Sequence, residues 1–217
     1  MELNRDFNVV HLRKITILTA IVLSIIGCSP YNRILEDIYD NDQEAREWTV
    51  GMASLSADEI EKHSYEMAHT DSLNQAKVFG ILDKEGWPSK LSEKANQAIF
   101  LVIDHSDLES QCKYLDLVKS KAEDGELNAS DYAVLHDRVL MKQGKPQIYG
   151  TQIKMAATIV GEDISMQLYL WPVEDHLALD SLRNSIGLSP IEDYLKNSGE
   201  SIGQEIIWDR ERSVADF

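Results

Sequence analysis

The chain has few positive charges for its length. It contains 21 lysine and arginine residues against 37 aspartate and glutamate residues, which gives a formal net charge of −16 over 217 residues. Proteins that bind nucleic acid neutralise phosphates with a basic face, so this balance argues against nucleic acid as a partner. It also disfavours electrostatic docking on anionic lipid. The composition favours a solvated and soluble acidic surface.

Long apolar runs are also scarce. The run from Ile15 to Gly27 is shorter than the roughly 20 residues that a membrane-spanning helix needs. It follows the basic residues Arg13 and Lys14, which is typical of an N-terminal targeting segment. Its end, Ile-Ile-Gly before Cys28, resembles a bacterial lipobox and predicts cleavage before that cysteine and its acylation. An ordinary signal peptide or a short uncleaved anchor is the alternative.

Cysteine is nearly absent, since Cys28 and Cys112 are the only two. With Cys28 acylated, Cys112 has no partner for an internal disulfide. A catalytic thiol would need a histidine and an electropositive setting. Cys112 lies instead in the sequence Cys-Lys-Tyr-Leu, so we expect it to be a small residue of the core.

These patterns divide the chain into a leader, a tether, one domain and a tail. Residues 1–27 are assigned to a lipoprotein signal peptide, and 28–41 to the lipidated cysteine and a tether that leads into the first helix. Residues 42–196 form a single globular domain, long enough for a real core. Residues 197–217 form a polar tail that we expect to be partly disordered. Ser29 stands where a retention aspartate would otherwise follow the cysteine, which favours the outer membrane over the inner one.

The hydrophobic periodicity predicts an α+β fold, mostly helical, with a β-hairpin in the C-terminal half. The segment 91–103 is the most apolar of the helical segments, and we expect it to be the central buried helix. Gly86-Trp87-Pro88 predicts a firm helix end before it. We expect helices over 31–48, 56–82, 91–103, 106–122, about 128–143, 176–186 and 190–195, and strands over 152–159 and 164–170.

The common catalytic signatures are missing. The sequence has no G-x-S-x-G nucleophile elbow, no glycine-rich phosphate loop and no H-E-x-x-H metal motif. Mixed histidine and carboxylate ligands suit zinc or iron, and Asp104, His105, Asp107 and His136 are the residues that could supply them. Without a recognised metal spacing, however, we predict neither a metal site nor a cofactor.

Polar groups concentrate between residues 104 and 152, and these could line one pocket. His105 can exchange a proton near neutral pH, and Arg138 can hold a carboxylate or phosphate with its planar fork. Asp137 or Asp104 could orient the imidazole. The candidate catalytic residues are therefore His105, Asp137 and Arg138, and the candidate ligand-binding residues are Asp107, Gln111, Tyr149, Thr151 and Gln152.

A purely structural interpretation accounts for the same residues. A histidine-serine-aspartate run at a helix start is ordinary capping chemistry. A buried aspartate–arginine pair often serves only to fix a packing geometry. In this interpretation the polar residues bridge the helical layer to the hairpin.

Four short motifs in order resemble an uncharacterised bacterial family, the domain of unknown function 6624. The resemblance covers roughly residues 42–194. Asp104 and Ser110 depart from its pattern, which usually has a glutamine and an aromatic residue at those positions. The resemblance implies no activity, because the family has no established function. The motifs are Gly86-Trp87-Pro88, Asp104-His105-Ser106-Asp107, Asp137-Arg138-Val139 and Tyr149-Gly150-Thr151-Gln152.

The sequence therefore predicts a bacterial envelope lipoprotein, held on the membrane by Cys28. We expect a binding or interaction domain with a polar pocket, whose partner is a small anionic ligand or an envelope protein. The alternative is a hydrolase of an anionic or envelope-derived substrate, with His105 as acid and base and Arg138 as the anion clamp. The enzyme hypothesis requires these two side chains to lie near each other.

Overall fold

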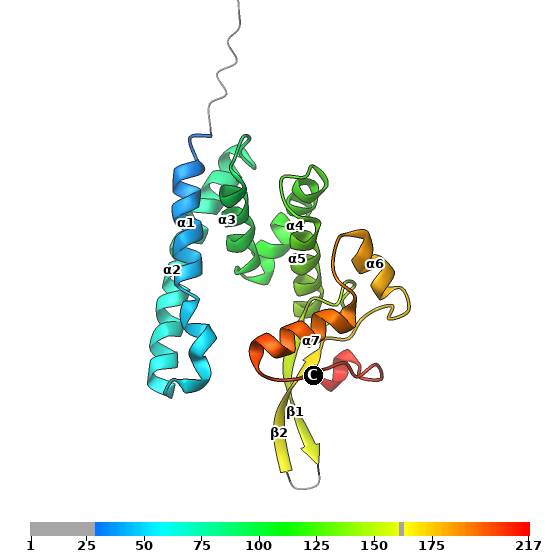
Figure 1. The fold of residues 1–217 in the computed structure, drawn as a ribbon. Coiled ribbons are helices and arrows are strands. Elements are labelled where there is room, and N and C mark those ends of the chain that lie inside the picture. Colours follow the sequence, from blue (N-terminus) through cyan, green and yellow to red (C-terminus); the bar gives the residue numbers. More distant parts are fainter. Residues whose placement is uncertain (1–28, 161–162) are drawn as a thin grey trace, which may run out of the picture.

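The computed structural model describes residues 29–160 and 163–217. Within them the fold is α+β and mostly helical, as predicted (Figure 1). The leader and Cys28 lie outside the described residues, as do Gly161 and Glu162. The elements are α1 (Asn32–Glu44), η1 (Glu47–Ser54), α2 (Ala57–Glu85), α3 (Glu93–Asp104), α4 (Leu108–Glu123), α5 (Ala129–Lys142), β1 (Ile153–Val160), β2 (Asp163–Leu170), α6 (Leu179–Ser185), α7 (Ile191–Ile202), β3 (Ile206–Ile207) and η2 (Val214–Asp216).

Helix α3 is the centre of the larger core, which confirms the prediction for the most apolar segment. Ala95, Ala98, Ile99, Val102 and Ile103 on this helix are all buried, at the spacing of one continuous apolar surface. In Figure 1, α1 runs beside α3, and α4 and α5 stand together on its other side. The C-terminal end of α3 therefore comes close to the end of α1 and to α5.

The helix boundaries follow local capping chemistry. The Ser56 hydroxyl accepts a hydrogen bond from the Glu59 N–H in a capping box that opens α2. Gly86 ends the same helix with a φ of 72°, a conformation that favours glycine. The Asp107 carboxylate accepts the Ser110 N–H at 2.8 Å and so begins α4.

The sheet lies in the C-terminal half, in the order β1-β2-β3. The predicted hairpin is confirmed, because β1 and β2 pair antiparallel with Ile153 opposite Leu170. Strand β3 pairs parallel to β2, with Ile206 opposite Leu168. Figure 1 shows the hairpin extending away from the helices, with α7 crossing near its base. A second, smaller core joins the sheet to α6 and α7 through Leu170, Leu179, Ile191, Leu195 and Ile206.

Two expectations differ from the structure. Cys112 is exposed rather than buried, because α4 turns Gln111, Tyr114 and Val118 inward and leaves Cys112 on the solvent side. The segment 197–217 contains the rest of α7, all of β3 and η2, whereas we expected partial disorder. Ile206 explains the order in this segment, since its buried side chain completes the second core.

Candidate functional site

Asp137 holds the loop that follows α5. Its side chain is fully buried, and its carboxylate accepts backbone N–H groups from Ile148 at 2.8 Å, Tyr149 at 3.1 Å and Thr151 at 3.0 Å. The Thr151 hydroxyl donates a further bond at 2.9 Å. A carboxylate with this many donors has no capacity left for a substrate. The geometry therefore gives Asp137 a structural role.

The same loop is closed by two buried side chains that the sequence analysis did not rank as site residues. Gln147 donates to the carbonyl of Trp171 at 2.6 Å and accepts the N–H of Gln152 at 2.8 Å. Arg183 donates to the carbonyl of Tyr149 at 2.7 Å and to that of Ser189 at 2.7 Å. All the hydrogen bonds of these two side chains go to backbone groups that would otherwise be buried without partners, and the Arg183 guanidinium also lies 4.9 Å from the centre of the Tyr194 ring.

The candidate ligand-binding residues have structural partners as well. Gln111 is buried and donates to the carbonyl of Asp104 at 2.6 Å, which fixes the turn between α3 and α4. Asp107 caps α4. The amide of Gln152 donates to the carbonyl of Val134 at 3.2 Å. The ring of Tyr149 lies 6.4 Å from that of His136. The structure thus does not gather these residues around His105.

His105 and Arg138 do converge, on either side of Asp104. Arg138 Nε lies 3.0 Å from Asp104 Oδ1, and His105 Nε2 lies 4.0 Å from Asp104 Oδ2. The Arg138–Asp104 pair lacks hydrogen-bond geometry among the described residues. Burial raises the pKa of Asp104, and the charges of Arg138 and His105 oppose that effect only in part. The condition for the enzyme hypothesis, that these two side chains lie near each other, is met.

The sequence analysis missed the residue that orients His105. Asp42, at the end of α1, is 1% exposed, and its Oδ1 lies 2.9 Å from His105 Nδ1. Burial raises the pKa of Asp42, but the hydrogen bond to His105 and the charges of His105 and Arg46 leave it below its ordinary value. Because a carboxylate only accepts, Nδ1 carries the proton, and Nε2 is the free acceptor of the neutral ring. No spacing in the sequence links residue 42 to residue 105.

Arg46 extends this network to α2. It contacts Asp42 at 3.0 Å and donates to both carboxylate oxygens of Asp71, at 2.8 and 3.0 Å. On the other side, Lys142 donates to the carbonyl of Ser106 at 3.1 Å. Burial lowers the pKa of Lys142, and the charge of Arg138 lowers it further. The side chains of His105 and Arg138 remain 20% and 31% exposed, so the network opens to solvent at these two residues.

The charges of this network nearly balance. Four acids, Asp42, Asp71, Asp104 and Asp107, stand against the three cations Arg46, Arg138 and Lys142, and His105 adds a positive charge when it is protonated. In a strongly acidic chain, this is a place where three cations gather and the opposite charges are nearly matched.

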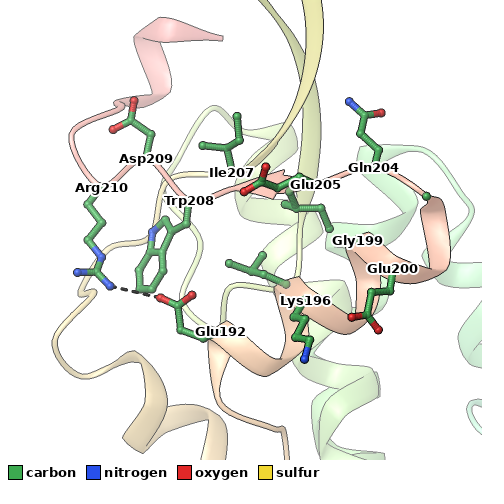
Figure 2. A pocket seen from close by; sticks show the side chains of 13 residues that line it. Glu192, Lys196, Gly199, Glu200, Gln204, Glu205, Ile207, Trp208, Asp209 and Arg210 are labelled. Atoms are coloured by element: carbon green, nitrogen blue, oxygen red, sulfur yellow. Dashed lines mark ion pairs between the residues drawn. The ribbon is translucent and has the colours of Figure 1, made fainter.

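The cavities of the described part of the chain lie elsewhere. One of about 900 Å³ runs between α7 and β3, and Figure 2 shows its walls, with Glu192 paired to Arg210 at 3.5 Å across one end. A second, of about 630 Å³, lies between the end of α1, η1 and α2. Neither is lined by His105 or Arg138.

The described ranges 29–160 and 163–217 contain no group of three histidine, cysteine or acidic residues placed to hold a metal ion. In the same ranges, every helix is too short or too polar to cross a membrane.

Comparison with known proteins places the chain in a family. No curated protein and no solved structure matches it. One family model, described as a family of unknown function (DUF6624), matches residues 32–206, which is wider than the 42–194 expected from the motifs. Because this match spans most of the 217 residues, the chain belongs to the DUF6624 family.

Proposed function

We propose that this chain is a lipid-anchored envelope protein that binds a small anionic ligand through Arg138, with His105 and Lys142 beside it. The observation that supports this proposal most is that the Arg138 guanidinium has no hydrogen-bond partner among the described residues. Among residues 29–160 and 163–217 it makes no hydrogen bond, and its one ion pair runs through Nε. Its two terminal nitrogens are therefore available as a planar fork for a carboxylate or phosphate.

The neighbours of Arg138 support an anion rather than a neutral ligand. Asp104 is the one acid paired with Arg138 among the described residues, and the pair runs through Nε alone. Lys142 lies near enough for its charge to interact with that of Arg138. His105 lies on the other side of Asp104 and can donate a hydrogen bond to a bound anion when its ring carries the proton.

The test is titration of the full-length chain with inorganic phosphate and with acetate, followed by calorimetry and by backbone amide resonances. Arg138→Lys keeps the charge and removes the fork, and should weaken binding by about tenfold, which corresponds to roughly 1.4 kcal/mol. Arg210→Gln alters an exposed cation far from the site and should leave binding unchanged. Absence of saturable binding of both anions by the parent would overturn the proposal.

Loss of binding must be separated from loss of folding. Arg138→Gln alone would leave the buried Asp104 without its cation. The double variant Asp104→Asn, Arg138→Gln removes both charges together. If the double variant has the same Tm as the parent and no longer binds the anions, the guanidinium of Arg138 is the group that binds them.

A second candidate is a hydrolase at the same place, and the Asp42–His105 contact favours it. Asp42 holds Nδ1 at 2.9 Å and leaves Nε2 without a hydrogen bond among the described residues. A ring held in this way can take a proton from water as the water attacks an ester, and later return it to the leaving group. Arg138 would then stabilise the negative charge of the substrate.

Hydrolysis of p-nitrophenyl phosphate and p-nitrophenyl acetate distinguishes the two functions. An enzyme should lose activity in both His105→Gln and Asp42→Asn. A parent that binds phosphate and hydrolyses neither compound is a binding protein.

The proposed lipid anchor and envelope location are tested in a separate experiment. Acylation at Cys28 predicts a mass larger than that of the polypeptide cleaved before this residue, and fractionation with membranes. Cys28→Ala should abolish both. A soluble parent without acyl chains would contradict the anchor and leave the anion site untouched.

A further inference from the structure

A second polar site lies in the cavity of about 630 Å³ between the end of α1, η1 and α2. This volume falls within the range of small-molecule sites. The cavity is distinct from the Arg138 site, because neither His105 nor Arg138 lines it. Its walls are formed by Asn41, Glu44, Ala45, Glu47, Trp48, His63, Glu66, Met67, Thr70, Leu73, Asn74 and Lys77.

Two hydrogen-bond donors on these walls are buried and unpaired. Asn74 is 2% exposed, and its amide nitrogen has no partner among the described residues. The indole nitrogen of Trp48 is also buried and has no partner among the described residues, while the Trp48 residue as a whole is half-buried. Two other indoles in this chain are paired, since Trp87 donates to Asn96 at 2.8 Å and Trp171 to the carbonyl of Lys145 at 2.8 Å.

Unpaired donors of this kind are costly. A buried donor without an acceptor costs about 1–3 kcal/mol. Native proteins therefore pair nearly all such groups, with protein atoms or with bound molecules. Trp48 and Asn74 both line one cavity, although neither nitrogen is accessible from it in the free protein. Rotation of these side chains would bring both donors to the oxygen acceptors of a single ligand.

The other walls restrict the ligand further. The rings of Trp48 and His63 stack, with centroids 5.5 Å apart and planes 15° apart, which gives the cavity an apolar aromatic wall. Three glutamates, Glu44, Glu47 and Glu66, line the cavity together with one lysine, Lys77. This excess of carboxylates repels an anion, in contrast to the Arg138 site.

We propose that this cavity binds a neutral sugar of one or two rings. A hydroxyl group both accepts and donates, so one compound can take the hydrogen bonds of Trp48 and Asn74 and donate to the glutamates. The C–H face of a sugar ring suits the aromatic wall. An anion lacks the donors and meets the glutamates, and a purely apolar ligand leaves both buried N–H groups unpaired.

The four tryptophans give a direct measurement. In the ¹⁵N-labelled full-length chain, the indole N–H resonances are assigned by single Trp→Phe variants. Glucose, galactose and N-acetylglucosamine at millimolar concentration are the probes, with phosphate and tetramethylammonium as charged controls. At least one sugar should shift the Trp48 indole in a saturable manner and leave the Trp87 and Trp171 indoles unchanged.

Two substitutions test whether the donors are used. Trp48→Phe keeps an aromatic ring and Asn74→Leu keeps the side-chain size, and each should weaken sugar binding at least fivefold. Asn74→Leu should not lower Tm, because it removes a donor that has no partner in the free protein. Trp48→Phe also shortens the ring that stacks on His63, so its affinity is compared at temperatures where the variant is folded. The matched variants Trp87→Phe and Asn96→Leu, which break a paired bond, should lower Tm and leave sugar binding unchanged below that temperature.

Three results would overturn the proposal. The first is that none of the three sugars shifts the Trp48 indole. The second is that only tetramethylammonium does so, which would make this a cation site. The third is that a sugar binds with undiminished affinity to both donor variants. The phosphate titration at Arg138 is independent of each of these results.

Discussion

Asp137 and Arg138 are neighbours in the sequence but serve different parts of the molecule. The Asp137 carboxylate is buried and holds the backbone of residues 148–151, whereas Arg138 reaches Asp104 at the end of α3 and remains partly exposed. Successive residues of a helix point about 100° apart, so α5 presents one to the hairpin side and the other to α3. Joint assignment of the two residues to one catalytic set does not fit this geometry.

Asp137→Asn should strongly destabilise the protein. The variant places an amide donor among three backbone N–H donors and removes the charge that they bind. Each unsatisfied donor costs about 1–3 kcal/mol, so we expect a loss of about 3 kcal/mol or more in the free energy of unfolding. Urea denaturation measures it. Asp107→Asn is the control, because asparagine caps a helix as well as aspartate does. Equal losses in the two variants would contradict the structural role.

Gly150→Ala should cost more than Gly144→Ala. Both glycines have positive φ, 67° and 68°, so alanine is strained by about 1–2 kcal/mol at either position. At position 150 a Cβ would also lie 3.1 Å from Ile191 Cδ1, whereas at position 144 it meets nothing within 4 Å. Thermal unfolding should therefore show a larger fall in Tm for Gly150→Ala. A larger fall for Gly144→Ala would mean that α7 does not press on the loop.

Asp42→Asn should reduce the acid sensitivity of the fold. The pKa of Asp42 is lowered in the folded state, so its contribution to stability is present above the unfolded pKa and is lost as the pH falls through the folded one. The parent should lose this contribution as the pH falls below about 5, whereas the variant lacks it at every pH. Urea denaturation across this range would show the two curves converging in acid. A constant difference at every pH would exclude the linkage.

Asp104→Asn should show the opposite pH dependence. The pKa of Asp104 is raised by burial, so the protonated carboxyl favours the folded state, and this contribution is lost as the pH rises through the folded pKa. The stability of the variant relative to the parent should therefore increase from about pH 4 toward neutral. The same denaturation series measures it. A relative stability that falls toward neutral pH would show that the ionised carboxylate is the favoured form.

The fold was largely predictable because its signals are local. The stripe of Ala95, Ala98, Ile99 and Val102 predicts a buried helix, and the period of two after Pro146 predicts the hairpin. Cys112 was assigned to the wrong environment because the prediction rested on its sequence neighbours, whereas adjacent residues of a helix point about 100° apart and α4 turns Gln111 inward instead. The order in β3 depends on pairing with β2, which short-range patterns do not contain.

The site was only partly predictable, because its contacts join distant segments. His105 and Arg138 were chosen for their chemistry and do converge, but Asp42, which holds the imidazole, is 63 residues away from it. Asp137 and Gln152 belong to the polar stretch that was expected to line a pocket, and their side chains turn out to satisfy backbone groups. Density of polar residues alone does not distinguish a ligand site from a well-satisfied loop.

The bond from Arg183 to the carbonyl of Tyr149 also constrains the order in which the chain folds. It spans 34 residues, and the hydroxyl of Tyr194 donates to the carbonyl of Thr151 across 43. During synthesis the five N-terminal helices emerge first and can bury their shared core early. The loop after α5 acquires its last partners only when α7 has left the ribosome. We therefore expect folding in two phases, with a slower closing step that belongs to this loop and the second core.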